Sequence, residues 1–259
     1  MKLAGVIPVI LLCLGSYPPQ LQAQVAQPTQ TPTGNTQKRL EKLKFPRSGA
    51  PTGRRQGGAR RNGCPNLNQS VTALVPGERT VNNESISFVA LTVSEYPTFW
   101  VYVPELPANL RSGEFIFQDE KGKNIYKTAL KLPDRSGIIG ITLPQNPQYA
   151  LKQDNKYQWY FKVYCGDPEN TSDYYYVKAW VQKVALSPNL ENQLKQSKPE
   201  YTAYAVNQIW QDALTNLAQL RRTNSGSLVL AQDWNNLLKA VGLEEFATAA
   251  IVQRYTLER

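Results

Sequence analysis

Aromatic side chains in residues 156–186 could form a ligand-binding surface. In this stretch core-forming residues alternate with polar ones, which is the period of two that a strand with one buried face requires. The polar-alternating face carries Tyr160, Tyr164, Tyr174, Tyr176 and Trp180. Rings on a flat sheet are a suitable surface for sugars. The alternative is structural, because a β domain capped by helices also buries aromatic residues on its second face.

An acidic turn joins the two strands of this hairpin. Asp167, Glu169, Asn170 and Asp173 place four oxygen-bearing side chains within seven residues, and Ca²⁺ binds six to eight such oxygens. Asp167, Glu169 and Asp173 are therefore candidate metal ligands. The alternative is a plain turn, because the spacing of an EF-hand is absent and Asp, Asn and Pro are ordinary turn-forming residues. No other cofactor is indicated.

The chain contains no histidine, which excludes Ser-His-Asp and Cys-His catalysis and imidazole metal sites. Acid–base chemistry would depend on carboxylates, tyrosines or lysines. Carboxylates near predicted strands could in principle run glycoside hydrolysis. They are Glu95, Glu105, Glu114, Asp119 and Glu120. None lies in an obviously apolar context, and surface solvation explains them all.

The N-terminus has the pattern of an export signal. Lys2 precedes an apolar run, and a small-residue cleavage site follows at Ala23. We assign 1–23 as a signal peptide and expect export to the periplasm or the cell exterior. No later apolar run is long enough to span a membrane. Cys13, inside the run, follows Leu12 where a lipoprotein signal requires a small residue, so lipidation is not expected.

Signal removal leaves two cysteines, Cys64 and Cys165. In an oxidising compartment we predict that they form a disulfide bond. The alternative is a pair of reduced, buried thiols.

The net charge of +9 is concentrated in one segment. Residues 27–61 carry nine Lys or Arg against one Glu, whereas 62–259 hold equal numbers of basic and acidic side chains. Residues 24–62 are rich in Gln, Thr, Pro, Gly and Arg with almost no apolar pattern, and we predict a disordered linker there. Because the rest is neutral and the chain has an export signal, nucleic acid is not an expected partner.

From Cys64 onward, short runs of β-forming residues alternate with turn residues. We predict eight strands, at 70–75, 86–93, 98–103, 113–118, 124–131, 137–143, 156–165 and 174–185. This spacing favours an antiparallel, Ig-like β-sandwich over residues 63–186.

After Leu186 the apolar period changes to 3.6, which predicts helices at 188–196, 200–222, 232–241 and 243–250. We assign 187–259 as a helical region packed on the sandwich, because the long apolar stripe of 200–222 would otherwise be exposed. We expect these helices to cover the row Tyr160, Tyr164, Tyr176 and Trp180. A covered row could not bind a sugar.

Several motifs resemble a family of exported cyanobacterial proteins known as domain of unknown function 928. They are GRRQGGARRNGCP (53–65), PTFWVYVP (97–104), GEFIFQDE (113–120), a Leu-Pro-Asp-Arg-Ser-Gly-Ile turn (132–138), KYQWYFKVYC (156–165), IWQDALTNLAQLRR (209–222) and DWNNLLKAVGL (233–243). The resemblance covers roughly 53–245, and Ala179 stands where the family pattern has Gly. It implies export and a similar architecture, but no catalytic residues, because the family has no assigned activity.

The sequence therefore favours a non-enzymatic binding or accessory module of the cell envelope or exoproteome. Its expected partner is an unidentified envelope or extracellular molecule, either protein or polysaccharide. The alternative is a carboxylate-based hydrolase or a carbohydrate-binding protein that acts on polysaccharide.

Overall fold

The computed structural model describes residues 40, 43–45, 51–59, 63–80, 82, 84–169, 172–196 and 198–257. The predicted signal peptide and much of the predicted linker lie outside the described residues. Within the described part, the chain is mainly β with a helical C-terminal region.

Twelve strands lie within the described residues. They are β1 (Gly53–Ala59), β2 (Thr72–Ala73), β3 (Gly77–Arg79), β4 (Ser85–Ser87), β5 (Val89–Thr92), β6 (Thr98–Val103), β7 (Ser112–Asp119), β8 (Asn124–Lys131), β9 (Gly137–Thr142), β10 (Lys156–Tyr164), β11 (Tyr174–Lys183) and β12 (Ile251–Thr256). Short 3₁₀ helices are η1 (Ala108–Leu110), η2 (Pro147–Tyr149) and η3 (Glu244–Phe246).

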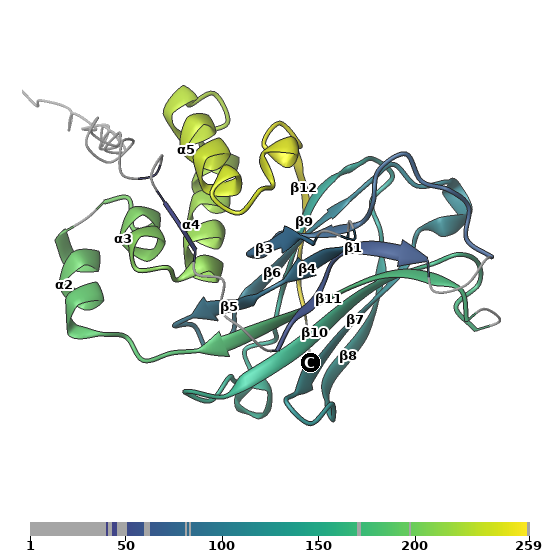
Figure 1. Ribbon diagram of the computed structural model, residues 1–259, viewed down its shortest axis with the longest axis horizontal. Coiled ribbons are helices and arrows are strands. Elements are labelled where there is room, and N and C mark those ends of the chain that lie inside the picture. The colour runs from purple at the N-terminus through teal and green to yellow at the C-terminus, as the bar shows by residue number, and fades with distance from the viewer. Residues whose placement is uncertain are drawn as a thin grey trace, which may run out of the picture.

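The strands form one curled sheet rather than the predicted eight-strand sandwich. Its main path runs β12-β9-β6-β2-β1-β11-β10-β7-β8, with β3, β4 and β5 paired beside it. In Figure 1 the sheet bends round on itself like half of a barrel. Curling lets one sheet enclose a core that a sandwich would build from two. The strand predicted over 86–93 is divided into β4 and β5, β3 was not predicted, and β5 pairs with β11 in parallel rather than antiparallel. Alternation also does not indicate whether a sheet closes on itself or packs on a second sheet.

β1 lies in the middle of the sheet, although its residues belong to the predicted linker. It pairs with β11 along one edge and with β4 and β2 along the other, since Arg54 pairs with both Lys178 and Ile86. Gly53 permits this position, since a Cβ there would lie 2.2 Å from the carbonyl oxygen of Lys178. Arg55 is buried, and its Nη1 donates a hydrogen bond of 2.6 Å to the carbonyl of Val241. The linker prediction is therefore wrong for residues 53–59.

The concave face of the sheet holds the larger apolar core. Phe99, Phe115, Trp159 and Phe161 are fully buried there, and the Phe99 ring lies 5.1 Å from that of Trp159. These side chains come from β6, β7 and β10 at every second position. The inward half of the predicted alternation is thus confirmed.

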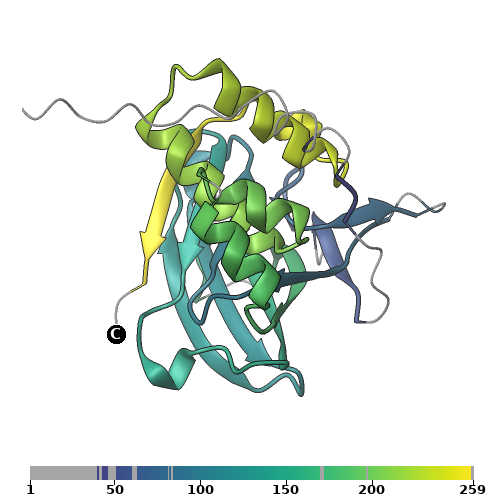
Figure 2. The same ribbon diagram turned by 90° about the vertical axis from the view of Figure 1, so that its left-hand side faces the viewer.

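Helices cover the outer face of β6 and its neighbours. They are α2 (Pro188–Gln196), α3 (Tyr201–Val206), α4 (Trp210–Thr223) and α5 (Leu228–Lys239). Figure 2 shows them gathered on one side of the sheet. Trp100 and Tyr102 point outward from β6 into this second apolar cluster. The indole N–H of Trp100 donates to the Thr215 hydroxyl at 2.9 Å, which fixes α4 against the strand.

An apolar part of the predicted linker also packs on these helices. Leu40 is 1% exposed, and the ring of Phe45 meets the Trp210 ring edge-on at 4.9 Å. Trp210 in turn donates its N–H to the carbonyl of Leu74 at 2.8 Å. This segment therefore contributes to the core, contrary to its prediction as a linker.

The helical prediction differs from the structure at three places, one of which is a shift of bounds from the expected 232–241 to α5 (Leu228–Lys239). The single helix expected over 200–222 is interrupted between α3 and α4, where Gln208 adopts φ 63°, a left-handed conformation that a helix cannot include. The helix expected over 243–250 is only the short η3, followed by β12. β12 pairs in parallel with β9, so the C-terminal region also supplies an edge strand. No helix in the described residues combines the length and apolar composition needed to cross a membrane.

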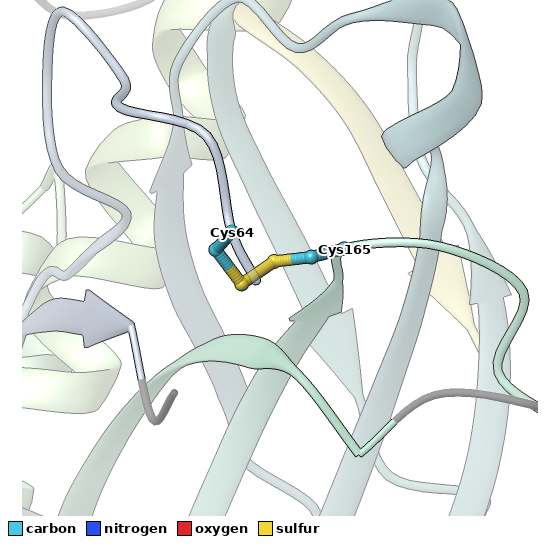
Figure 3. The surroundings of a disulfide bond; sticks show 2 residues. All are labelled: Cys64 and Cys165. Carbon is cyan, nitrogen blue, oxygen red and sulfur yellow. A yellow bond between two sulfur atoms is a disulfide. The ribbon is translucent and has the colours of Figure 1, made fainter. Parts of the chain in front are cut away.

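Cys64 and Cys165 form a disulfide with a Cα–Cα distance of 5.1 Å (Figure 3). Cys165 directly follows β10, and Cys64 lies in the loop between β1 and β2. The predicted pairing is confirmed.

Candidate functional site

The candidate site lies on the convex face of β10 and β11, opposite the main core. Residue pairing places Tyr160 opposite Lys178 and Lys162 opposite Tyr176. Rings and ammonium groups therefore alternate along and across the two strands. The inward residues between them, such as Phe161 and Val177, are fully buried and hold the hairpin in this orientation.

A groove of about 480 Å³ runs over this face. We call it the tyrosine–lysine groove, and it is lined by Ile116, Gln118, Tyr160, Lys162, Tyr174, Tyr176 and Lys178. The side chains on its floor come from β7, β10 and β11. Because the groove lies on the outer surface of a sheet, it suits an extended ligand better than a small enclosed one.

Three cations of this face lie over aromatic rings, and one of them, Lys178, lies over both Tyr160 and Trp180. Lys162 Nζ lies 4.8 Å from the Tyr174 ring centroid, and Lys178 Nζ lies 5.5 Å from that of Tyr160. Arg54, from β1, lies 5.4 Å from the Tyr176 ring. Such contacts hold flexible basic side chains across the face, where each is worth about 0.5–1 kcal/mol at an exposed site. The rings and cations therefore form one preorganised surface.

The charges of this face are only partly neutralised. Glu114, on the neighbouring strand β7, is buried and forms ion pairs with Lys127 at 2.8 Å and Lys162 at 3.1 Å. Lys178 and Arg54 have no carboxylate partner among the described residues. The groove therefore keeps a positive end that favours an anionic ligand.

Glu114 is a structural carboxylate. Burial raises its pKa, but hydrogen bonds from Lys127 and Lys162 outweigh that effect and hold the pKa below its usual range. Burial, together with the hydrogen bond to Glu114, raises the pKa of the Tyr164 hydroxyl to about 12. Glu114 stays ionised as an acceptor for its neighbours and is a poor proton donor.

The predicted row of Tyr160, Tyr164, Tyr176 and Trp180 is only partly accessible in the structure. Tyr160 and Tyr176 line the groove, and Tyr164 contacts Tyr174 beside it at 5.9 Å between ring centroids. Trp180 is 6% exposed and donates its N–H to the carbonyl of Thr52 at 3.2 Å. The chain leading into β1 therefore covers Trp180 and removes it from the accessible surface.

The helices do not cover this row, contrary to the expectation from sequence. They pack against β5 and the outer side of β6, because Trp100 and Tyr102 offer large apolar side chains there. The lysines of the groove would have lost their hydration under a helix.

Lys162 and Lys178 were missed as site residues, although the same alternation places them beside the tyrosines. Arg54 could not be found, because its strand looks like linker in the sequence.

The other predicted groups remain dispersed. Asp167 accepts a hydrogen bond from the backbone N–H of Glu169 at 3.0 Å, as an Asx turn does. In the part of the chain that the structure describes, no group of three or more Cys, Asp or Glu side chains could hold a metal ion. That part includes Asp167, Glu169 and Asp173, so the structure offers no support for the calcium interpretation.

The remaining candidate carboxylates have ordinary surface roles. Glu95 forms an ion pair with Lys183 at 3.0 Å, and Asp119 accepts N–H groups of its own turn. Glu105 and Glu120 are exposed. None of them lines the tyrosine–lysine groove.

Comparison with known proteins gives a family without an assigned activity. A family model described as Domain of Unknown Function (DUF928) matches residues 55–251. No curated protein matches the chain. The matched range begins inside β1 and ends at the first residue of β12, so it includes both the groove and the helices.

Proposed function

The chain belongs to the Domain of Unknown Function (DUF928) family, and we propose that it is an exported, non-enzymatic module that binds an extended acidic polysaccharide. The observation that carries the proposal is the tyrosine–lysine groove. Tyr160 and Tyr176 supply flat rings, while Lys178 and Arg54 supply charges with no carboxylate partner among the described residues.

Two features support the extracellular setting. The disulfide between Cys64 and Cys165 is typical of oxidising compartments. The N-terminal apolar run has the length of a signal peptide rather than of a membrane span.

A hydrolase is disfavoured by the state of Glu114, the carboxylate that pairs with Lys162 of the groove. Glu114 is bound by two lysines that lower its pKa, whereas a general acid needs a raised pKa. The groove therefore has the chemistry to hold an acidic polymer without cleaving it.

The test is affinity electrophoresis of the purified protein in gels that contain polyglucuronate, dextran sulfate or neutral dextran. We expect retardation by the two polyanions and none by neutral dextran. Lys178→Ala and Tyr160→Ala should each weaken polyanion binding about fivefold, which corresponds to about 1 kcal/mol per contact. Lys239→Ala makes the same change of charge at an exposed position near the end of α5.

Equal loss of binding in Lys178→Ala and Lys239→Ala would show attraction by net charge alone and would contradict the proposal. Undiminished binding in Tyr160→Ala would remove the aromatic part of the recognition.

A further inference from the structure

A second cavity lies between the start of α4 and the ends of β6 and β9. It has a volume of about 270 Å³, which corresponds to about nine water molecules. We call it the α4–sheet pocket, and its lining includes Thr98, Thr142, Gln211, Asp212, Thr215 and Arg254. None of them belongs to the tyrosine–lysine groove, so the two cavities can be tested separately.

Gln211 is the unusual residue of this pocket. It is only 1% exposed, and neither its Oε1 nor its Nε2 has a hydrogen-bond partner among the described residues. An amide offers two donors and an acceptor, and leaving such groups buried and unpaired destabilises a protein. Because Gln211 lines the pocket, a polar molecule in the pocket is the natural partner for this amide.

The other polar groups of the pocket are held in place by the protein. Arg254 donates through Nη2 to the Thr98 hydroxyl at 3.2 Å and through Nε to the Thr142 hydroxyl at 3.3 Å. Asp212 accepts from the Thr92 hydroxyl at 2.7 Å and from the backbone N–H of Val93 at 3.2 Å, both through one oxygen. The positions of the guanidinium and the carboxylate are thus fixed before any ligand arrives.

The charges of the pocket favour a neutral ligand. The lining holds one guanidinium, Arg254, and two carboxylates, Asp212 and Glu200, the second of which is paired with Lys198. An anion would meet the carboxylates and a cation would meet the guanidinium. The rest of the lining is mostly hydroxyl and amide groups, together with the rings of Tyr96 and Tyr204. A molecule with many hydroxyl groups can both donate to the carboxylates and accept from the guanidinium and the amide.

We propose that the α4–sheet pocket binds a single neutral sugar ring, either a free monosaccharide or the terminal residue of a glycan chain. Gln211 and Asp212 accept hydrogen bonds from its hydroxyls, and Arg254 donates to them. The volume holds one ring, so a longer glycan enters by its end only. This site is independent of the proposed polymer binding in the groove, because it uses different residues and a ligand of different charge.

The experiment measures binding by titration calorimetry and saturation-transfer NMR on the purified protein. The probes are D-glucose, D-galactose, D-glucuronate, L-glutamine and maltotriose. We expect binding of at least one neutral hexose and none of glucuronate or glutamine. Binding of maltotriose as well as the hexose would indicate a glycan end, and binding of the hexose alone would indicate a free sugar. Absence of hexose binding, or preference for glucuronate or glutamine, would overturn the proposal.

The decisive variant is Gln211→Leu, which keeps the approximate size of the side chain and removes its unpaired amide. It should weaken hexose binding about tenfold without lowering the melting temperature of the free protein. Gln196→Leu, on an exposed position at the end of α2, is the matched control and should change neither quantity. If Gln211→Leu lowers the melting temperature and leaves hexose binding unchanged, the amide has a structural role and the proposal is refuted.

Discussion

Asp212→Asn should make the protein more stable at neutral pH and leave its stability unchanged in acid. Burial raises the pKa of Asp212 from 3.8 to about 6, despite hydrogen bonds from Thr92 and Val93 that act in the opposite direction. The folded protein therefore holds this proton more tightly than the unfolded chain does. The stability that this protonation contributes is complete below about pH 4 and is lost as the pH rises to about 6.

The magnitude follows from the two pKa values. The rise from 3.8 to about 6 corresponds to about 3 kcal/mol in the free energy of unfolding. We take this as an upper limit, because Asp212 is partly exposed to the α4–sheet pocket. An asparagine can still accept hydrogen bonds from the Thr92 hydroxyl and the Val93 N–H, but it carries no charge at any pH. The variant should therefore gain up to that amount over wild type between pH 4 and pH 6.

Urea denaturation of both proteins at half-unit steps from pH 3.5 to pH 7.5 measures this difference. Subtracting the wild-type from the variant free energy cancels the titration of the remaining carboxylates, Glu114 included. Glu120→Gln makes the same change of net charge at an exposed turn and controls for long-range electrostatics. A difference that is flat across this range, or that falls with rising pH, would refute the assignment of Asp212 as a carboxylate destabilised by burial.

Three further outcomes follow from the fold. Deleting residues 1–59 should abolish cooperative unfolding followed by circular dichroism, whereas deleting residues 1–39 should not, because only the longer deletion removes Leu40 and β1. Replacing both disulfide cysteines by serine should lower the free energy of unfolding in urea by about 3–5 kcal/mol, since the bond joins residues 101 apart; a loss below 1 kcal/mol would contradict this. Gly140→Ala should lower the melting temperature by several degrees, because its Cβ would lie 2.8 Å from the Trp100 ring; an unchanged value would show that the indole can move.

Alternation alone was sufficient for the strands with an apolar face. β6 and β8 have the predicted bounds, β10 ends one residue earlier than predicted, and β7 is longer by one residue at each end. The residues that point inward, such as Phe161, were identified for the same reason: a period of two permits only one buried set.

β1 could not be found in this way, because Gly-Arg-Arg-Gln-Gly-Gly-Ala has the composition of a linker. Its glycines serve close backbone contact: a Cβ on Gly57 would lie 3.2 Å from the carbonyl oxygens of Tyr176 and Val71. Glycine is required by neighbouring strands that are distant in sequence, so the requirement cannot be inferred from the local composition.

The aromatic residues of the candidate site could be predicted from the sequence, but the exposure of their face could not. The alternation assigned Tyr160 and Tyr176 to the outward face, but it did not say which outward face the helices would choose. That choice depends on the competition between two surfaces, one carrying Trp100 and Tyr102 and the other carrying lysines. The pocket at Gln211 could not be predicted from the sequence, because an amide can be identified as unpaired only when its surroundings are known.

The position of β1 also determines when the sheet can be completed as the chain folds. β1 is the first described strand, yet it joins β2 to β11, which lies far along the sequence. At one edge of the sheet, β9 pairs with β12, which lies near the C-terminus. The β1–β11 and β9–β12 pairings each bring together segments that are far apart in sequence, which costs loop entropy before any hydrogen bond forms. Proteins dominated by such distant contacts fold slowly. We therefore expect folding in one late cooperative step, during which partly formed sheets with open edges are the species most exposed to aggregation.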